Sequence, residues 1–429
     1  MRLFLNNFCL VTFLLALAFN TSANAEDRPA AEAYLVSGDL DGGERALEAA
    51  LKDHPDDAQA RFGLGMIQFV HGVERLVQSF YRHGLDLEGA GGAVPFARIP
   101  VPTNPNPKPI SYEDLRAILQ TMVDDLARSE QTLAQVKDKS VKLPIRFGLV
   151  RLDFDGDGKA SDEETLWKIF ARLNRLDGQP AGPAEKRAEN ENVNEEEAAF
   201  LIAFDYGDVA WLRGYSHLLS ALLELYLAHD GKTLFEHTAH RFFVDPKTPF
   251  PNLKSQRGVD PGPAWNFARI ADLVAFVHLQ RYPLKEPKRM ESVLRHLESM
   301  IQLSRESWTS YLAETDNDHE WIPNPKQTTV IPRTKVTEEM VKAWHDLLKE
   351  VELILQGKLL VPFWRGAEGQ GVNLRKVFTE PRDLDVILWL QGTAAQPYLE
   401  AGSITTPDFW SRINRAFNGQ FVGFALWFN

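Results

Sequence analysis

The chain has 429 residues, a length that suggests two or three domains. Its 47 Lys and Arg residues against 59 Asp and Glu residues give a formal net charge of −12. This balance argues against general nucleic-acid binding, because proteins that bind phosphate backbones present a basic face. A hydrophobic content of 44% with 25% charged residues is typical of a folded globular protein.

Residues 1–25 have the features of a secretory signal peptide. Arg2 is the only charged residue there, an apolar run extends from Phe8 to Phe19, and the segment ends in Ala-Asn-Ala. A run of this length is shorter than the roughly 20 apolar residues of a membrane span. An uncleaved anchor is the alternative interpretation. The sequence predicts cleavage near Ala25 and an exported protein, periplasmic or secreted, with no integral membrane segment after signal removal.

Residues 26–90 contain an internal repeat of small and large residues at helical spacing. The first copy ends at Pro55, and a weaker second copy opens at Asp56-Asp57. The pattern resembles the tetratricopeptide (TPR) repeat, which implies helical hairpins. Two interpretations stay open: a groove that binds a protein or peptide partner, or a helical packing layer. The first copy is carried by Ala31, Tyr34, Gly38, Leu40, Leu47 and Ala50, and the second by Leu64, Gly65, Gly72 and Tyr81.

The rest of the chain predicts four further segments. Six prolines make residues 91–110 an extended connector. Residues 111–177 begin with a helix-start signal, Ser111 with Asp114, and residues 178–197 form a polar linker. Residues 198–429 form an aromatic-rich helical domain that resembles no family. The predicted fold class is mainly α; candidate helices are 197–229, 232–242, 264–281, 286–312 and 337–356, and short strand candidates are 145–152 and 358–364.

The strongest chemical motif is DFDGDGKASDEE at residues 153–164. Acidic residues occupy positions 1, 3 and 5, a glycine occupies position 6, and a glutamate occupies position 12. This segment resembles the EF-hand calcium loop over its full length. The resemblance implies Ca²⁺ as the cofactor. The implied metal ligands are Asp153, Asp155, Asp157, the carbonyl of Lys159, Ser161 and Glu164.

This loop departs from the EF-hand family in two respects. Position 8 is Ala160 instead of a larger β-branched residue, and no second loop of this pattern follows. The preceding segment, Leu143 to Leu152, starts near a proline and is extended or a short helix. The following segment predicts a helix, with Leu166, Ile169, Phe170 and Leu173 on one face. We therefore expect a single structural calcium loop. A surface acidic turn that binds no ion is the alternative.

The sequence contains only weak signals for catalytic residues. Asp205, Asp208, Arg213 and His217 line a polar pocket in one interpretation; in the other, the two acids cap a helix and the remaining side chains form a paired polar stripe. Glu236, His237 and His240 lack the spacing of a zinc-protease motif. The loop Asp316–Trp321 is a metal or sugar site, or a solvated acidic turn. The sequence has no G-x-S-x-G and no phosphate-binding loop, and its one cysteine lies within the predicted signal.

Two functions are compatible with these patterns. The first is an exported, calcium-binding helical protein whose TPR-like repeats serve as an interaction or scaffold module. The alternative is a periplasmic hydrolase or glycan-processing enzyme that uses the acids and histidine between Asp205 and His217. The second requires these groups to converge in one cleft, because acid and base partners must reach the same substrate. The sequence alone assigns no reaction.

Overall fold

The computed structural model describes residues 28–86, 102–168, 200–250, 266–331 and 334–428. These residues confirm the predicted fold class, mainly α. The predicted signal segment and the predicted polar linker lie outside the described residues, as does most of the proline-rich connector. The helices are α1 (Ala30–Ser37), α2 (Leu40–Asp53), α3 (Ala58–Arg82), α4 (Tyr112–Leu133), α8 (Tyr206–Ala228), α9 (Lys232–Thr238), α11 (Asn266–His278), α12 (Pro287–Ala313), α13 (Glu338–Leu355), α14 (Leu374–Thr379), α15 (Val386–Gln391), α16 (Pro407–Ala416) and α17 (Phe421–Phe428).

The short strands form three small antiparallel sheets. The strands are β1 (Lys142–Arg146), β2 (Leu201–Asp205), β3 (Arg281–Tyr282), β4 (Val361–Pro362), β5 (Gln370–Val372), β6 (Leu384–Asp385) and β7 (Leu399–Ala401). β1 pairs with β2, β3 pairs with β6, and β5 lies between β4 and β7. The strands therefore join segments that are distant in the sequence without forming a large sheet.

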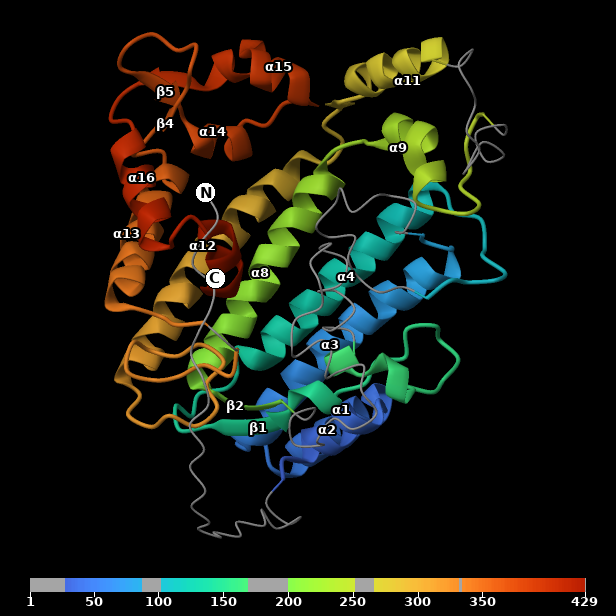
Figure 1. Cartoon of the computed structure of the whole chain (residues 1–429), viewed down its shortest axis with the longest axis vertical. Coiled ribbons are helices and arrows are strands. Elements are labelled where there is room, and N and C mark those ends of the chain that lie inside the picture. The colour runs from blue at the N-terminus through green and yellow to red at the C-terminus, as the bar shows by residue number, and fades with distance from the viewer. Residues whose placement is uncertain (1–27, 87–101, 169–199, 251–265, 332–333, 429) are drawn as a thin grey trace, which may run out of the picture.

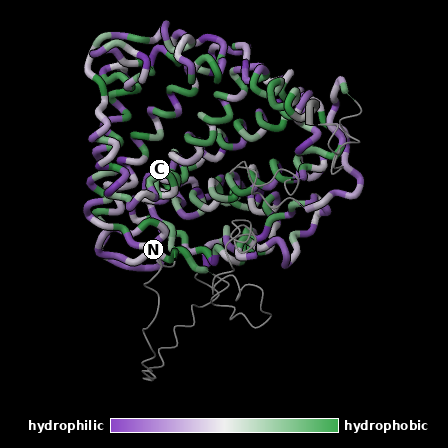
Figure 2. The backbone as a smooth tube through the Cα atoms, turned by 45° about the horizontal axis from the view of Figure 1, so that its top comes forward, coloured by the Kyte–Doolittle hydropathy of each residue, from purple (hydrophilic) through white to green (hydrophobic). Residues whose placement is uncertain are grey.

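The long helices lie side by side in chain order, from α2 through α3, α4, α8 and α12 to α13 (Figure 1). Hydrophobic stretches run along these helices and hydrophilic stretches lie mostly at the periphery (Figure 2). One apolar core joins α1, α2 and α3 to the β1–β2 pair, and a second joins α8 to α12, α13, α16 and α17. Trp211 packs against both cores, so the interior is continuous from the N-terminal helices to α17.

Helix α3 occupies the place of the second predicted TPR-like copy. It is one continuous helix of 25 residues, Ala58–Arg82, and not a hairpin. Its glycines allow close helix approach: a Cβ on Gly63 would lie 2.6 Å from the Cβ of Ala31, and one on Gly65 would lie 2.5 Å from the side chain of Leu133. The small residues that suggested a second hairpin therefore fit α3 between α1 and α4.

Part of the segment predicted as a single helix from 197 to 229 is a strand in the structure. Residues Leu201–Asp205 form β2, and its partner β1 covers Lys142–Arg146, slightly before the predicted strand 145–152. Pairing with β1 buries Ile202 and Phe204, and this tertiary contact outweighs the helical spacing. Helix α8 then starts at Tyr206, directly after the capping residue Asp205.

The other predicted helices agree with the structure to within a few residues. Ser111 accepts the N–H of Asp114, and the Asp114 carboxylate accepts the N–H of Ser111. This capping box starts α4 where the sequence indicated a helix start. Helices α11, α12 and α13 likewise correspond to the predicted ranges 264–281, 286–312 and 337–356.

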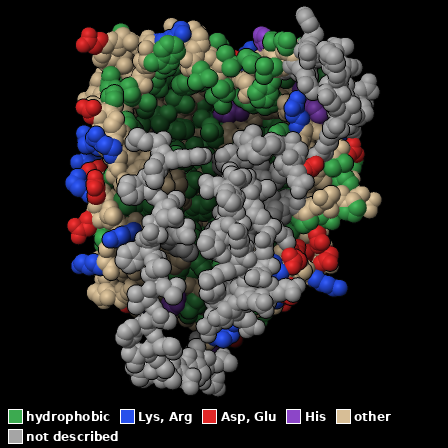
Figure 3. Space-filling model, in the orientation of Figure 1, with side chains coloured by type: hydrophobic (Ala, Val, Ile, Leu, Met, Phe, Trp, Pro, Cys, Tyr) green, Lys and Arg blue, Asp and Glu red, His purple; other side chains and the backbone are tan. Residues whose placement is uncertain are grey.

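Apolar side chains are exposed at the end of the molecule where α11 and α15 lie (Figure 3). Leu273 on α11 is 65% exposed and Leu390 on α15 is 67% exposed. Among the described residues, no helix combines the length and the hydropathy that a bilayer-crossing segment requires.

Candidate metal centre

The 153–164 loop is closed at its base by backbone hydrogen bonds. Arg151 and Thr165 form an antiparallel bridge, and the N–H of Leu166 donates to the carbonyl of Val150 over 2.9 Å. Leu152 and Phe154 flank the first acidic residue and are buried in the N-terminal core. The apolar side chains therefore fix the start of the loop, while the backbone bridge brings its end alongside.

The carboxylate of Asp153 organises the turn. Its Oδ1 accepts the N–H of Gly156 at 2.8 Å and of Asp157 at 3.2 Å, and its Oδ2 accepts the N–H of Gly158 at 2.9 Å. Gly156 and Gly158 have φ of 71° and 82°, in the left-handed region that favours glycine. The glycine at loop position 6 thus permits the reversal that the sequence pattern required.

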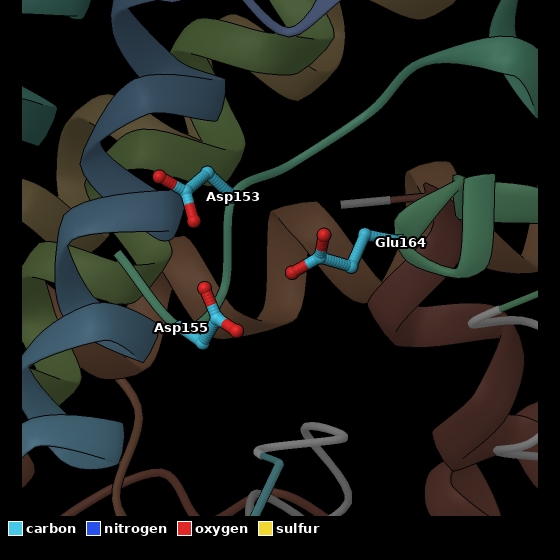
Figure 4. A group of neighbouring side chains, drawn as sticks. All are labelled: Asp153, Asp155 and Glu164. Carbon is cyan, nitrogen blue, oxygen red and sulfur yellow. The ribbon is translucent and has the colours of Figure 1, made fainter. Parts of the chain in front are cut away.

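Three of the predicted ligands bring their carboxylates together. Asp153, Asp155 and Glu164 each offer an oxygen, and these oxygens all lie within 4.8 Å of one another (Figure 4). Oxygen ligands of one calcium ion lie at about 2.3–2.6 Å from the metal, so two ligand oxygens are separated by at most about 5 Å. The three carboxylates therefore fit the coordination distances of a calcium ion.

The other predicted ligands complete the turn in different ways. Asp157 accepts the N–H of Lys159 at 2.8 Å, and the hydroxyl of Ser161 donates to Glu164 at 2.7 Å. Burial, followed by the negative charges of Asp157 and Glu164, raises the pKa of Asp155. Like charges thus crowd this turn, and a bound divalent cation would offset part of their negative charge.

Two residues of α3 hold the loop in place. Glu74 accepts the N–H of Asp153 at 2.7 Å, and the side-chain amide of Gln78 donates to the carbonyl of Asp153 over 2.7 Å. Glu74 and Gln78 lie one helical turn apart and therefore on the same face of α3. Glu74 is buried, which raises its pKa to about 7. Sequence reasoning missed both residues, because nothing local links α3 to the loop.

The flanks of the loop differ from those of an EF-hand. Strand β1 and a 3₁₀ turn at Phe147–Leu149 precede it, so the preceding segment is extended over its first half. A 3₁₀ turn at Asp162–Glu164 carries the last ligand, and helical residues follow from Leu166. The predicted apolar positions Ile169, Phe170 and Leu173 lie outside the described residues.

The candidate catalytic residues fall into two groups along α8. Asp205 is the N-cap: its Oδ1 accepts the N–H of Gly207 at 2.7 Å, and the Asp208 carboxylate accepts the N–H of Asp205 at 3.0 Å. The Tyr311 hydroxyl donates to Asp208 over 2.9 Å, and both side chains are buried. These two acids therefore cap the helix, as the second interpretation of the sequence expected.

Arg213 and His217 belong to the other group. Arg213 pairs with Glu130 of α4 at 2.9 Å, and His217 Nδ1 lies 2.7 Å from Nδ1 of His296 on α12. Burial lowers the pKa of His217 to about 4. At a rise of about 1.5 Å per residue, His217 lies about 18 Å along α8 from Asp205. The two acids and the histidine consequently share no common acid–base pocket.

A buried carboxyl cluster forms around Asp205 instead. Oxygens of Asp205, Glu314 and Glu320 lie within 4.8 Å of one another. Glu320 comes from the predicted Asp316–Trp321 loop and is buried; Asp316 of the same loop pairs with Lys142 at the surface. Glu314, the C-cap of α12, was not singled out by the sequence. Burial and the neighbouring Asp205 raise the pKa of Glu314 to about 9.

The Glu236–His240 segment makes local contacts. Glu236 pairs with Lys232 at 3.9 Å, and the His237 ring donates from Nδ1 to the carbonyl of Thr233 over 2.7 Å. Neither His237 nor His240 belongs to a potential metal-binding group of three or more residues within the described ranges.

Comparisons with known proteins identify no family for this chain. The chain matches no family model, no curated protein and no solved structure. The arrangement of its own residues is therefore the basis for assigning a function.

Proposed function

We propose that the protein binds one Ca²⁺ ion in the 153–164 loop and that this ion braces the N-terminal half of an exported helical protein. The observation that carries the proposal is the convergence of the carboxylates of Asp153, Asp155 and Glu164. Hard oxygen ligands in this number and charge suit calcium. The carbonyl of Lys159 and the remaining loop oxygens are the further ligands that the EF-hand resemblance implies.

The main effect of the bound ion would be to stabilise the folded state of the protein. Without a cation, the carboxylates of this loop repel one another across a partly buried turn. Bound calcium would offset much of that repulsion, so its binding free energy would add to the folding free energy of the surrounding segments. Those segments are strand β1, which precedes the loop in the chain, and helix α3, which contacts Asp153 through Glu74 and Gln78. In this proposal the TPR-like helices serve as the platform on which the loop is docked.

An extracellular or periplasmic setting fits a single loop of this kind. Exported calcium modules have dissociation constants on the order of 10⁻⁴–10⁻³ M. Weak binding is sufficient outside the cytosol because calcium is abundant there. The apolar segment Phe8–Phe19 followed by small residues supports export.

Thermal unfolding of the protein in calcium, magnesium or chelator tests this proposal. At about 10 mM calcium, a site with this range of affinity would stabilise the fold by about 1.4–2.7 kcal/mol, which raises Tm by a few degrees. Magnesium should have a smaller effect, since it demands a tighter octahedral site. Glu164→Gln should abolish the calcium-dependent rise.

Glu163→Gln is the matched control. Glu163 neighbours Glu164, is exposed, and pairs with Lys168 instead of joining the carboxylate group. This variant should keep the calcium response of the wild type. An equal response of wild type and Glu164→Gln, or no response of the wild type at millimolar calcium, contradicts the proposal.

A further inference from the structure

A pocket of about 410 Å³ opens beside the calcium loop. One wall is the loop itself, with Asp153 and Asp155. The opposite wall combines the end of α3, at Tyr81 and Arg82, with the segment that carries Lys108. The volume lies in the range of about 300–1,000 Å³ found for small-molecule sites.

The wall opposite the loop is preformed by hydrogen bonds. The N–H of Lys108 donates to the carbonyl of Arg82 over 2.8 Å, and the Asn104 side chain donates to the carbonyl of Tyr81 over 2.9 Å. The Asn104 side chain also accepts the N–H of Asn106 at 2.8 Å. These bonds hold the cationic residues of two distant segments next to each other at the pocket.

The two cations of this wall, Arg82 and Lys108, have no direct carboxylate partner in the part of the chain that the structure describes. A larger cavity of about 650 Å³ between α4, α8, α12 and α13 contains both a paired and an unpaired arginine among the described residues. There Arg213 pairs with Glu130, and Glu306 accepts the Tyr206 hydroxyl at 2.6 Å. Arg295 in the same cavity donates to the Ser292 hydroxyl over 2.7 Å. The smaller pocket differs in having two cations, Arg82 and Lys108, that no described carboxylate pairs with.

We propose that this pocket binds a small hydroxylated carboxylate, such as a uronic acid, in a calcium-dependent manner. The ligand carboxylate would lie against Arg82 and Lys108, which provide charge-assisted hydrogen bonds. Its hydroxyls would face the loop, where calcium takes six to eight oxygens and commonly accepts some from outside the protein. The Tyr81 ring offers an apolar surface to the ligand ring. The inference rests on the proposed calcium site.

Calcium dependence follows from the charges of the two walls. Asp153 and Asp155 would repel an anion while the loop carries no cation. A bound calcium ion adds two positive charges to that wall, which weakens the repulsion, and it offers the ligand hydroxyls a metal to coordinate. Ligand binding should therefore be strong with calcium and weak with chelator, and the ligand should in turn raise the affinity for calcium, because such coupling is reciprocal.

Isothermal titration of the whole protein with galacturonate, in calcium and in chelator, tests the inference. We expect binding of galacturonate in calcium. Binding should be at least about tenfold weaker in chelator, in Arg82→Gln/Lys108→Gln and with neutral galactose, because each change removes a charge that the complex requires. Arg295→Gln, in the larger cavity, is the matched control and should bind as the wild type does.

The outcomes separate the two proposals. If calcium itself fails to raise Tm, the calcium site is wrong. If calcium raises Tm but galacturonate does not bind, or binds equally to Arg82→Gln/Lys108→Gln, only the pocket inference is overturned. Inorganic phosphate serves as a further probe. Binding of phosphate without binding of galacturonate would identify a simple anion site and overturn the proposed ligand class.

Discussion

The carboxylate of Glu74 accepts the backbone N–H of Asp153 over 2.7 Å, although the two residues are 79 positions apart. This bond ties the first residue of the 153–164 loop to the middle of α3. Glu74→Ala removes the acceptor and leaves a buried N–H unpaired, which should destabilise the protein by about 1–3 kcal/mol. Urea unfolding in chelator measures this effect without interference from the ion.

Glu74→Gln separates the hydrogen bond from the charge. The glutamine carbonyl can still accept the N–H of Asp153, so this variant should lose less stability than Glu74→Ala. Calcium titration of both variants reports whether the geometry of the loop depends on α3. Equal stability of Glu74→Ala and the wild type would show that the bond does not fix the loop.

The sequence predicted the loop but not its environment. The glycine at position 158 and the acidic spacing are local, and they specify a turn whatever surrounds it. Glu74 and Gln78 are far from the loop in the sequence. The packing of α3 against strand β1 brings both side chains next to Asp153. Contacts between segments that are far apart in the chain produce no repeating residue pattern, so a single sequence does not predict them.

The same distinction holds for the fold. Amphipathic spacing and capping residues such as Ser111 predicted the long helices, because these signals lie within each element. The strand at Leu201–Asp205 escaped prediction, since its pairing with β1 is a tertiary contact. The sequence placed Asp205 at the start of the helix that carries His217, and the structure agrees, because Asp205 is the N-cap of α8. The distance between them along the helix axis prevents the two side chains from acting together.

Gly65 lets α3 approach α4 closely. An added Cβ would lie 2.5 Å from Cδ2 of Leu133, and the Leu133 side chain is fully buried and has little room to move. Gly65→Ala should therefore destabilise the protein by about 1–3 kcal/mol despite the better helix propensity of alanine. Thermal or urea unfolding measures the change.

Gly423→Ala provides the comparison for Gly65→Ala. Gly423 lies in α17, and an added Cβ there would meet no atom within 4 Å. The substitution should be neutral or stabilise by up to about 1 kcal/mol through helix propensity. Similar losses in both variants would mean that helix packing at Gly65 is not the cause.

A side-chain hydrogen bond joins Tyr311 on α12 to the capping acid Asp208. The hydroxyl donates over 2.9 Å, and both groups are buried. Tyr311→Phe keeps the ring but leaves a buried carboxyl oxygen without this donor, so we expect a loss of about 1–3 kcal/mol in the free energy of unfolding. Tyr226→Phe, at a partly exposed position on α8, should change stability much less; equal effects would contradict the assignment.

The carboxyl cluster of Asp205, Glu314 and Glu320 predicts a loss of stability at alkaline pH. Glu314 has a pKa of about 9 in the folded protein against 4.5 for an ordinary glutamate. Between these two values the folded state holds a proton that the unfolded state releases. Stability therefore falls as pH rises from about 4.5 to about 9, and the loss is complete above the folded pKa.

Glu314→Gln removes this titration, because glutamine stays neutral at every pH. The variant should show a flatter dependence of Tm on pH between about 5 and 9, with its largest gain over the wild type at the alkaline end. Some slope will remain, since burial also raises the pKa of Glu320 and of Asp208. Glu291→Gln, an exposed change on the same helix, controls for net charge. If Glu291→Gln flattens the profile as much as Glu314→Gln does, net charge is responsible and the buried cluster is not.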